Sequence, residues 1–475
     1  MSEPSYTLPV DVSFPSRPTP LVSGVTCKIF LPTRIASPVI LQLFPRQDQA
    51  SYFAGTPFCS IAGATVEAGG KGRTTIQADD IELHCSTKSW NSALAETICD
   101  GKPARLRILV NLPTSKLIGH FWLTPSVLLA PSKIVEASYT GSVKTRNVRM
   151  HRFLLPGGLR LTFDTHFRHE SNDSGETITF QELVAEFRPR RRQWPTWDVL
   201  RAFNFIDEYL LLVSFAERRR CVCLGLDVAV PPQSLERYYR RDVAMPEANE
   251  GPWSGEPLIS AADFAQFMNV AYGRLVEMNQ ASRDFMKQAL ARSLHRKSQV
   301  LEYSFMALYS ALEMIVLSFR RTAGLEYVLP PAQFGKRLRG DLAAYVASHP
   351  VLAAQPRQRD WLCANLSALN RIPFAEAFHL FRQRYNVDVD DLWPVTLSDV
   401  PLSRIRNRLV HGEQMVGTQF AALAVAYCNL KWVVERSILA VLGWPSNQSS
   451  ASRGRLAGDS IPYMTWKKHQ AAFRK

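Results

Sequence analysis

Three side chains that could act on a phosphodiester are gathered in one short span near the C-terminus. Arg406, Asn407 and His411 stand in the stretch RIRNRLVHGE. On a helix, Asn407 and His411 share a face because they are four residues apart, and the long Arg406 side chain can reach over to it. Such a trio could transfer a phosphodiester without a metal, with His411 as general acid or base, Arg406 balancing charge on the phosphoryl oxygens and Asn407 orienting the histidine or the phosphate.

The same spelling, R-N-x-x-x-H, occurs a second time at Arg146, Asn147 and His151. There the polar residues alternate with Val148 and Met150, which is typical of a strand. On a strand, residues five apart point to opposite faces, so Arg146 and His151 could not converge on one phosphate. We interpret this copy as a solvated basic strand.

The C-terminal copy has the signals of a helix. Ser398 or Asp399 can cap it, and Pro401 suits its first turn. Its buried stripe consists of Leu402, Ile405 and Leu409. Gly412 can take a left-handed conformation directly after His411 and end the helix, which leaves the imidazole near the negative end of the helix dipole. The pattern alone also fits a bland alternative, in which Arg406 pairs with an acidic neighbour and His411 is a polar residue at a helix end.

The N-terminal half has the periodicity of a β domain. From about Val25 to about Arg241, short apolar runs are separated by Pro, Gly, Ser and Asn, which predicts antiparallel strands in a sandwich or a distorted barrel. A helix is expected to interrupt them from Trp197 to Ile206, and the run LLLVSFAERRRCVCLGLDVAV that follows is interpreted as a return to strand. This β-rich domain is assigned to residues 1–245.

Past the stretch Met245 to Pro257 the apolar residues recur at helical intervals. Ser260 and Asp263 form a plausible capping pair, and three amphipathic stripes begin at Phe264, Leu301 and Phe420. We therefore predict an α+β chain in which an all-α helical bundle over 258–445 follows the β-rich domain. The residues from 446 to 475 read as a flexible C-terminal tail.

The composition favours a polyanionic partner. The chain of 475 residues carries a formal net charge of +14, which suits RNA, DNA or a lipid surface better than an acidic protein. Basic and aromatic residues are mixed in one region, and nucleic-acid contact and a solvated face both remain open for it. The candidate contacts are Arg190, Arg191, Arg192, Arg237 and Arg240, together with Arg408 beside the motif.

Other signals are weak. The N-terminus lacks the pattern of a secretory signal, so a cytoplasmic location is expected. The apolar segment MALYSALEMIVLSF is interrupted by Glu313 and falls short of the roughly 20 residues that cross a bilayer, so no membrane partner is predicted. The eight cysteines suggest neither a zinc site nor a disulfide framework. Asp388, Asp390 and Asp391 are interpreted as a loop and helix cap, and no cofactor or metal is expected.

The C-terminal half resembles a HEPN domain of the Apea-like branch found in bacterial anti-phage defence proteins. RNRLVH fits that superfamily's pattern of an Arg, a polar residue and a His, and Gly412 fits the branch's habit of following the His with Gly. LEYSFMALYSALEMIV resembles the helix with a mid-helix Glu, here Glu313, and AYCNLKWVVERSILAVLG resembles the closing helix. The N-terminal half resembles, more weakly, the β-rich sensing domains that precede this type.

The resemblance implies a metal-independent endoribonuclease of abortive infection, with RNA as substrate and a homodimer or higher symmetric oligomer as the working form. Its catalytic residues would be Arg406, Asn407 and His411, supported by Glu313 and Gly412, and a phage-derived trigger could switch it on. Some members have lost activity, so the alternative is a catalytically inactive scaffold that binds nucleic acid or dimerises. Glu313 could hold Arg406 in place or only satisfy the core.

Overall fold

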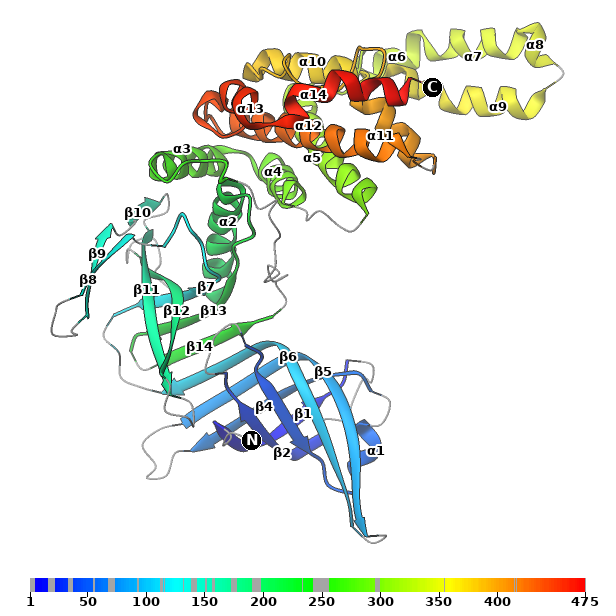
Figure 1. The fold of residues 1–475 in the computed structure, drawn as a ribbon. Helices are drawn as coiled ribbons and strands as arrows, with labels where there is room; N and C mark the ends of the chain where they lie inside the picture. The colour runs from blue at the N-terminus through cyan, green and yellow to red at the C-terminus, as the bar shows by residue number, and fades with distance from the viewer. Residues whose placement is uncertain are drawn as a thin grey trace. The chain divides into compact units, whose positions relative to one another are not determined.

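The computed structural model describes residues 5–15, 22–32, 37–53, 56–66, 73–91, 94–111, 114, 116–130, 132–137, 143–149, 152–155, 159–171, 177–189, 198–232, 234–241, 256–294, 300–353, 355–413, 415 and 417–474. The chain divides into two units, Met1–Gly255 and Glu256–Lys475. The first unit is built mainly of strands and the second of helices (Figure 1). The predicted α+β fold class is therefore confirmed.

Alternation of apolar and polar residues closes six antiparallel strands of the first unit into a barrel. Leu8, Val10 and Val12 point inward from one strand, while the residues between them face solvent. The barrel order is β6-β3-β2-β1-β4-β5, and pairing of β5 with β6 closes it. The strands are β1 (Tyr6–Ser13), β2 (Val22–Phe30), β3 (Ile40–Phe44), β4 (Phe58–Val66), β5 (Arg73–Asn91) and β6 (Leu94–Asn111). The short helix α1 (Ala50–Phe53) adds the buried Phe53, whose ring meets Phe14 edge-on.

The sheet continues beyond β6 along one edge. From β6 the order of the further strands is β14-β13-β7-β12-β11-β10. Strands β8 and β9 form a separate two-stranded sheet. These strands are β7 (Ile118–Leu123), β8 (Ser132–Ala137), β9 (Val143–Arg149), β10 (Arg152–Leu155), β11 (Leu159–Ser171), β12 (Thr177–Pro189), β13 (Cys223–Val230) and β14 (Ser234–Arg240). The first R-N-x-x-x-H copy places Arg146 and Asn147 on β9, as predicted, and His151 lies outside the described residues.

The expected helical insertion is longer than the sequence pattern suggested. Helix α2 (Val199–Glu217) is capped by Asp198, and it includes the run LLLVSFAE that we interpreted as strand. Strand character returns only at Cys223. The interpretation was wrong because α2 is buried over most of its second half, and a continuous apolar run reads alike in a buried helix and a buried strand.

A disulfide joins β5 and β6, contrary to the expectation that the cysteines form no such framework. Cys85 and Cys99 stand opposite each other in the register of these two strands, with their Cα atoms 3.9 Å apart. They are separated by 14 residues in sequence, and only the pairing of two long strands brings them together. Cysteine spacing in the sequence could not show this.

The second unit is a helical bundle centred on α5 (Leu301–Thr322), which packs against α4, α10, α11 and α12. The predicted stripe of α5 is buried from Phe305 to Phe319. By length and composition α5 is the one helix of the described residues that could cross a membrane, but its apolar face forms the core of the bundle. The other helices of the bundle are α3 (Phe264–Glu277), which packs on α4, together with α4 (Gln280–Ser293), α10 (Phe374–Tyr385), α11 (Leu402–Val410) and α12 (Thr418–Val441).

A helical arm is inserted between α5 and α10 and was not foreseen from the sequence. It contains α6 (Pro331–Arg337), α7 (Arg339–Ser348), α8 (Pro350–Ala353), α9 (Pro356–Asn365) and the 3-10 turn η1 (Leu366–Asn370). In Figure 1, α7, α8 and α9 project beyond the rest of the bundle. The side chain of buried Asn370 joins the two ends of the arm, because it accepts a hydrogen bond from the N–H of Leu329 and donates one to the carbonyl of Leu329.

The C-terminal segment is helical, so the prediction of a flexible tail was wrong. It forms η2 (Ser446–Gln448), α13 (Arg453–Asp459), α14 (Ile461–Gln470) and η3 (Ala471–Phe473), and α14 packs on α12. Ser452 and Ser460 cap the two helices. Phe473 is fully buried against Trp393. The polar, Ser-rich start of this segment concealed the aromatic anchors further along.

A buried ion pair joins this segment to the bundle. Arg436 of α12 makes two hydrogen bonds to Asp391, at 2.6 and 3.0 Å, and both side chains are almost fully buried. Tyr463 of α14 donates to the same carboxylate at 2.9 Å. Asp391 is thus a structural partner of Arg436, and the predicted helix cap is replaced by an ion pair.

Replacing Phe473 with Ala is expected to destabilise the helical unit by about 3–5 kcal/mol, because it leaves a cavity beside Trp393. Urea denaturation followed by tryptophan fluorescence measures the loss. Exposed Arg474→Ala is the matched control and should change stability by less than about 0.5 kcal/mol. Equal stability of the two variants would show that the C-terminal segment does not support the bundle.

Asp391 should make the stability of the unit depend on pH. Burial alone would raise the pKa of Asp391, but the hydrogen bonds from Arg436 and Tyr463 and the charge of Arg436 hold it below its ordinary value. A carboxyl with a depressed pKa contributes stability that is present above about pH 4 and is lost as the pH falls through the folded pKa. The difference in unfolding free energy between the native protein and Asp391→Asn should therefore shrink in acid, and a constant difference from pH 7 to pH 3 would contradict this.

Candidate functional site

The helix that carries the motif is positioned by backbone and core contacts. The first N–H groups of α11, those of Leu402 and Ser403, donate to the carbonyls of Pro394 and Val395, so no side-chain cap is needed. Pro401 is the N-cap residue, and the predicted caps Ser398 and Asp399 lie outside the helix. Leu402 and Ile405 are fully buried, as the stripe predicted, whereas Leu409, the third residue of that stripe, is only half-buried.

The helix ends where the sequence predicted. Gly412 has a φ of 74°, the left-handed conformation that favours glycine, and His411 is the C-cap residue. The N–H of Glu413 donates to the carbonyl of Arg408, and that of Gly412 to the carbonyl of Leu409. This pair of hydrogen bonds is a Schellman motif, which fixes the position of the imidazole at the end of the helix.

Arg406 is the centre of the polar contacts on the bundle side of α11. Its Nη2 lies 3.3 Å from the Oε1 of Glu313, and its Nη1 donates to the side-chain oxygen of Asn407 at 3.2 Å. Its guanidinium carbon stands 5.9 Å from the centre of the Tyr309 ring. The expected pairing of Glu313 with Arg406 is therefore confirmed, and the pair ties α11 to α5.

The electrostatics of this pair are governed by partial burial. Desolvation raises the pKa of Glu313, and the charge of Arg406 only partly opposes that effect. Burial also raises the pKa of Tyr309, with the Glu313 carboxylate adding to it, so the phenol keeps its proton. The Nε of Arg406 is buried and finds no hydrogen-bond acceptor among the described residues. Because this N–H is shielded from solvent, an anionic oxygen could reach only the exposed part of the arginine, and 31% of that side chain is exposed.

His411 lies apart from this cluster of side-chain bonds. It is exposed, its backbone N–H donates to the carbonyl of Asn407, and no side-chain bond to another described residue is found for its ring. The side chain of Asn407 contacts Arg406, so in this arrangement it orients the arginine and not the histidine. An imidazole that is exposed at a helix end is free to meet a ligand.

The other predicted contacts are mostly engaged in ion pairs. Arg408 bonds Glu413 and lies over the Phe473 ring. Arg237 makes two hydrogen bonds to Asp227, at 2.8 and 3.0 Å, and Arg240 makes two to Asp207, both at 3.0 Å. Their charges are thus largely balanced within the fold. Arg190, Arg191 and Arg192 lie outside the described residues.

Sequence reasoning missed Tyr309 and Ser403. Tyr309 stands one helical turn before Glu313 and so shares its face. Its hydroxyl is hydrogen-bonded to Ser403, which lies one turn before Asn407 on α11. The spacing of four residues on each helix was the available signal, but only the contact of α5 with α11 shows that the two faces meet.

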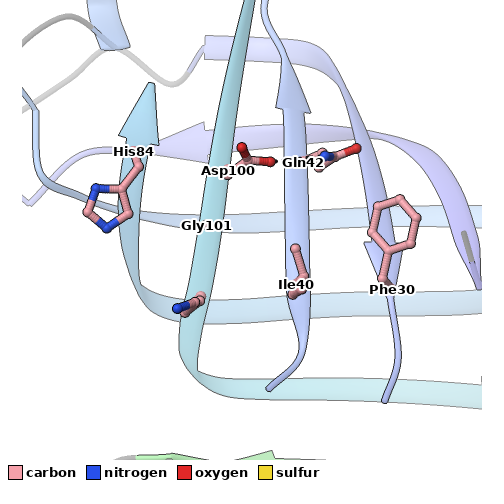
Figure 2. Close-up of a pocket in the computed structure, with 7 residues that line it drawn as sticks. Phe30, Ile40, Gln42, His84, Asp100 and Gly101 are labelled. Atoms are coloured by element: carbon pink, nitrogen blue, oxygen red, sulfur yellow. Dashed lines mark hydrogen bonds between the residues drawn. The ribbon is translucent and has the colours of Figure 1, made fainter. Parts of the chain in front are cut away.

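The barrel of the first unit carries a separate cavity of about 380 Å³ on its outer face. Figure 2 shows Phe30 and Ile40 on one side of it, with Gln42, Asp100 and His84 around the rest. Gln42 donates to Asp100 at 3.0 Å across β3 and β6. The mixture of apolar area and a few polar groups is typical of a small-ligand site.

Comparison with protein-family models, curated proteins and solved structures finds no match to this chain. Within the described residues no group of three or more His, Cys, Asp and Glu side chains is placed to hold a metal ion. The assignment of function therefore depends on the geometry around Arg406 and on the sequence pattern.

Glu313→Gln tests whether burial of the ionised Glu313 carboxylate lowers the stability of the folded protein. A raised folded pKa means that the native protein binds the proton more tightly than the unfolded chain, so the contribution of Glu313 to stability falls as the pH rises through its folded pKa. The native protein should lose stability relative to Glu313→Gln over that window, measured by urea denaturation at a series of pH values. The exposed Glu376→Gln on α10 is the control, and parallel pH profiles for native protein and Glu313→Gln would refute the expected shift.

Proposed function

We propose that the chain is a HEPN-type, metal-independent endoribonuclease. The observation that carries the proposal is that one bundle helix presents an arginine fixed by a carboxylate and ends in an exposed histidine. The arginine keeps 31% of its side chain exposed, and the imidazole is open to solvent. An arginine and a histidine of this kind are the groups that metal-free phosphoryl transfer requires.

The reaction would be an internal transesterification of RNA. The 2'-oxygen attacks the adjacent phosphorus, the bond from phosphorus to the 5'-oxygen breaks, and the products are a 2',3'-cyclic phosphate and a 5'-hydroxyl. One imidazole must take the proton of the 2'-hydroxyl and another must give a proton to the leaving 5'-oxygen. Arg406 would balance the charge that develops on the phosphoryl oxygens.

A symmetric dimer would supply the second imidazole. A twofold axis beside α11 places His411 of the partner subunit opposite the first one, without any further residue in the sequence. Exposed apolar side chains flank the helix and support such an interface. These are Leu397 before α11, Val410 at its end and Phe420 at the start of α12.

We assign the β-rich unit to sensing or restraint, in a cytoplasmic protein of anti-phage defence that acts by abortive infection. The cavity on the barrel supports a sensing role, since it offers a place for a ligand of phage origin. A triggered nuclease would stay silent until such a ligand binds. RNA-cleavage assays should therefore include phage lysate as well as purified protein.

The rival proposal is a catalytically inactive scaffold that binds nucleic acid or dimerises. The observation that favours it is that Arg406 already bonds Glu313 and Asn407, as a purely structural arginine would. The two proposals differ in what happens to bound RNA. An enzyme releases fragments with cyclic phosphate ends in the presence of EDTA, whereas a scaffold leaves the RNA intact.

His411→Ala is expected to abolish cleavage of total RNA, by at least about 100-fold if general acid-base catalysis is lost. Folding should be unchanged because the side chain is exposed. The matched control is the exposed His379→Ala on α10, which should cleave at the native rate. Gel analysis of RNA fragments and of their cyclic phosphate ends measures both. Native cleavage by His411→Ala in the presence of the trigger would end the nuclease proposal.

A further inference from the structure

The helical arm between residues 327 and 371 has a small core, because Phe334 and Leu366 are its buried apolar side chains. Every residue of α7 and α9 is at least partly exposed, although these are the two longest helices of the arm. Isolated helices of about ten residues are marginal in water, so α7 and α9 depend on packing against each other, and their remaining surface is open to a ligand. Its base is nonetheless held firmly, by the Asn370 bonds to Leu329 and a bridge between Tyr327 and Arg371.

Two large aromatic rings are presented on the arm. Tyr345 on α7 and Trp361 on α9 are each 66% exposed. Trp361 stands four residues after Arg357, so a ring and a guanidinium share one face of α9. An exposed aromatic beside a cation is the arrangement that stacks on a base while it contacts a phosphate.

The arm is strongly basic. Residues 327–371 contain six Lys or Arg against two Asp. Of these cations, Lys336, Arg337, Arg339 and Arg357 make no ion pair with any residue in the described part of the chain, in contrast to Arg237 and Arg240 of the β-rich unit. The charge of the arm is therefore available to a ligand.

The positive charge of the arm decides between two possible partners for the surface of α7 and α9, which are a second copy of the arm and a polyanion. A second copy of the arm would bring two surfaces of the same sign together, which opposes association. A polyanion is attracted by the same charge, and flat bases suit the two rings. The aromatic contacts require bases that are not paired in a duplex.

We propose that the arm is a binding site for single-stranded RNA and delivers the strand to Arg406. The choice of RNA as the ligand rests on the proposed ribonuclease function. The arm leads directly into α10, whose first residue, Phe374, lies 5.9 Å from the Tyr309 ring, and Tyr309 lies under Arg406. A strand held along the arm thus has a short path to the motif.

The test measures RNA binding apart from cleavage. Full-length protein carrying His411→Ala is titrated against a labelled single-stranded RNA of mixed sequence, and affinity is read from fluorescence anisotropy. Adding Trp361→Ala should weaken binding about tenfold or more through lost stacking, whereas Trp361→Phe should retain most of it. Adding Arg337→Ala with Arg357→Ala should make the slope of log affinity against log salt shallower by about 1.4, since each phosphate contact contributes about 0.7.

The matched control removes two exposed cations of the C-terminal segment, Arg453→Ala with Lys468→Ala, and should leave affinity and slope nearly unchanged. Unaltered binding by the arm variants would overturn the proposal, as would equal competition by duplex RNA. Sedimentation showing that the arm variants lose self-association while they bind RNA normally would assign the face to a second copy. Arm-dependent binding without any cleavage by the native chain, even when phage lysate is present, would refute the nuclease and leave the RNA site standing.

Discussion

The ion pair between Arg406 and Glu313 is the constraint on which the candidate site depends. Helix α11 has only nine residues, too few to be stable in isolation, and it is joined to α5 through this pair and two buried apolar side chains. The pair is half-buried, so its Coulomb attraction is offset by desolvation, which is why the pKa of Glu313 is raised and not lowered. Its main effect is to fix the guanidinium in one position, and its net contribution to stability is small.

The C-terminal segment extends this support to the other side of the same helix. Phe473 fills the space beside Trp393, and Arg408 lies over its ring while it bonds Glu413 just past the helix end. Arg406 and Arg408 therefore serve opposite partners, one toward α5 and one toward the C-terminal segment. The end of α11 is thus held by contacts on two sides, while the side chains of Asn407 and His411 are exposed.

The sequence predicted the features that depend on residues close together along the chain, and it missed most of those that depend on residues far apart. The stripes of α3, α5 and α12 and the Gly412 turn rest on periodicity and short-range rules, and these were predicted. The pairing of Glu313 with Arg406 joins two distant helices, and it was suggested only because a carboxylate in an apolar helix needs a cation. Barrel closure by β5 and β6, the Cys85–Cys99 bond and the contact of Tyr309 with Arg406 depend on residues distant along the chain. The arm was missed because its helices lack an apolar stripe, which is the signal by which helices are recognised. The HEPN resemblance, the RNA substrate and the dimer stay predictions.

Net charge is informative only after ion pairs have been taken into account. The sequence showed arginines clustered near the end of the β-rich half, yet Arg237 and Arg240 face carboxylates on neighbouring elements and are largely neutralised within the fold. The less conspicuous cations of the arm have no such partners among the described residues. A polyanion responds to the uncompensated field and not to the number of basic residues. Residues 256–475 contain 27 Lys or Arg against 17 Asp or Glu, so they carry +10 of the surplus of +14. Among the described residues of that unit, the arm combines unpaired cations with exposed aromatic rings.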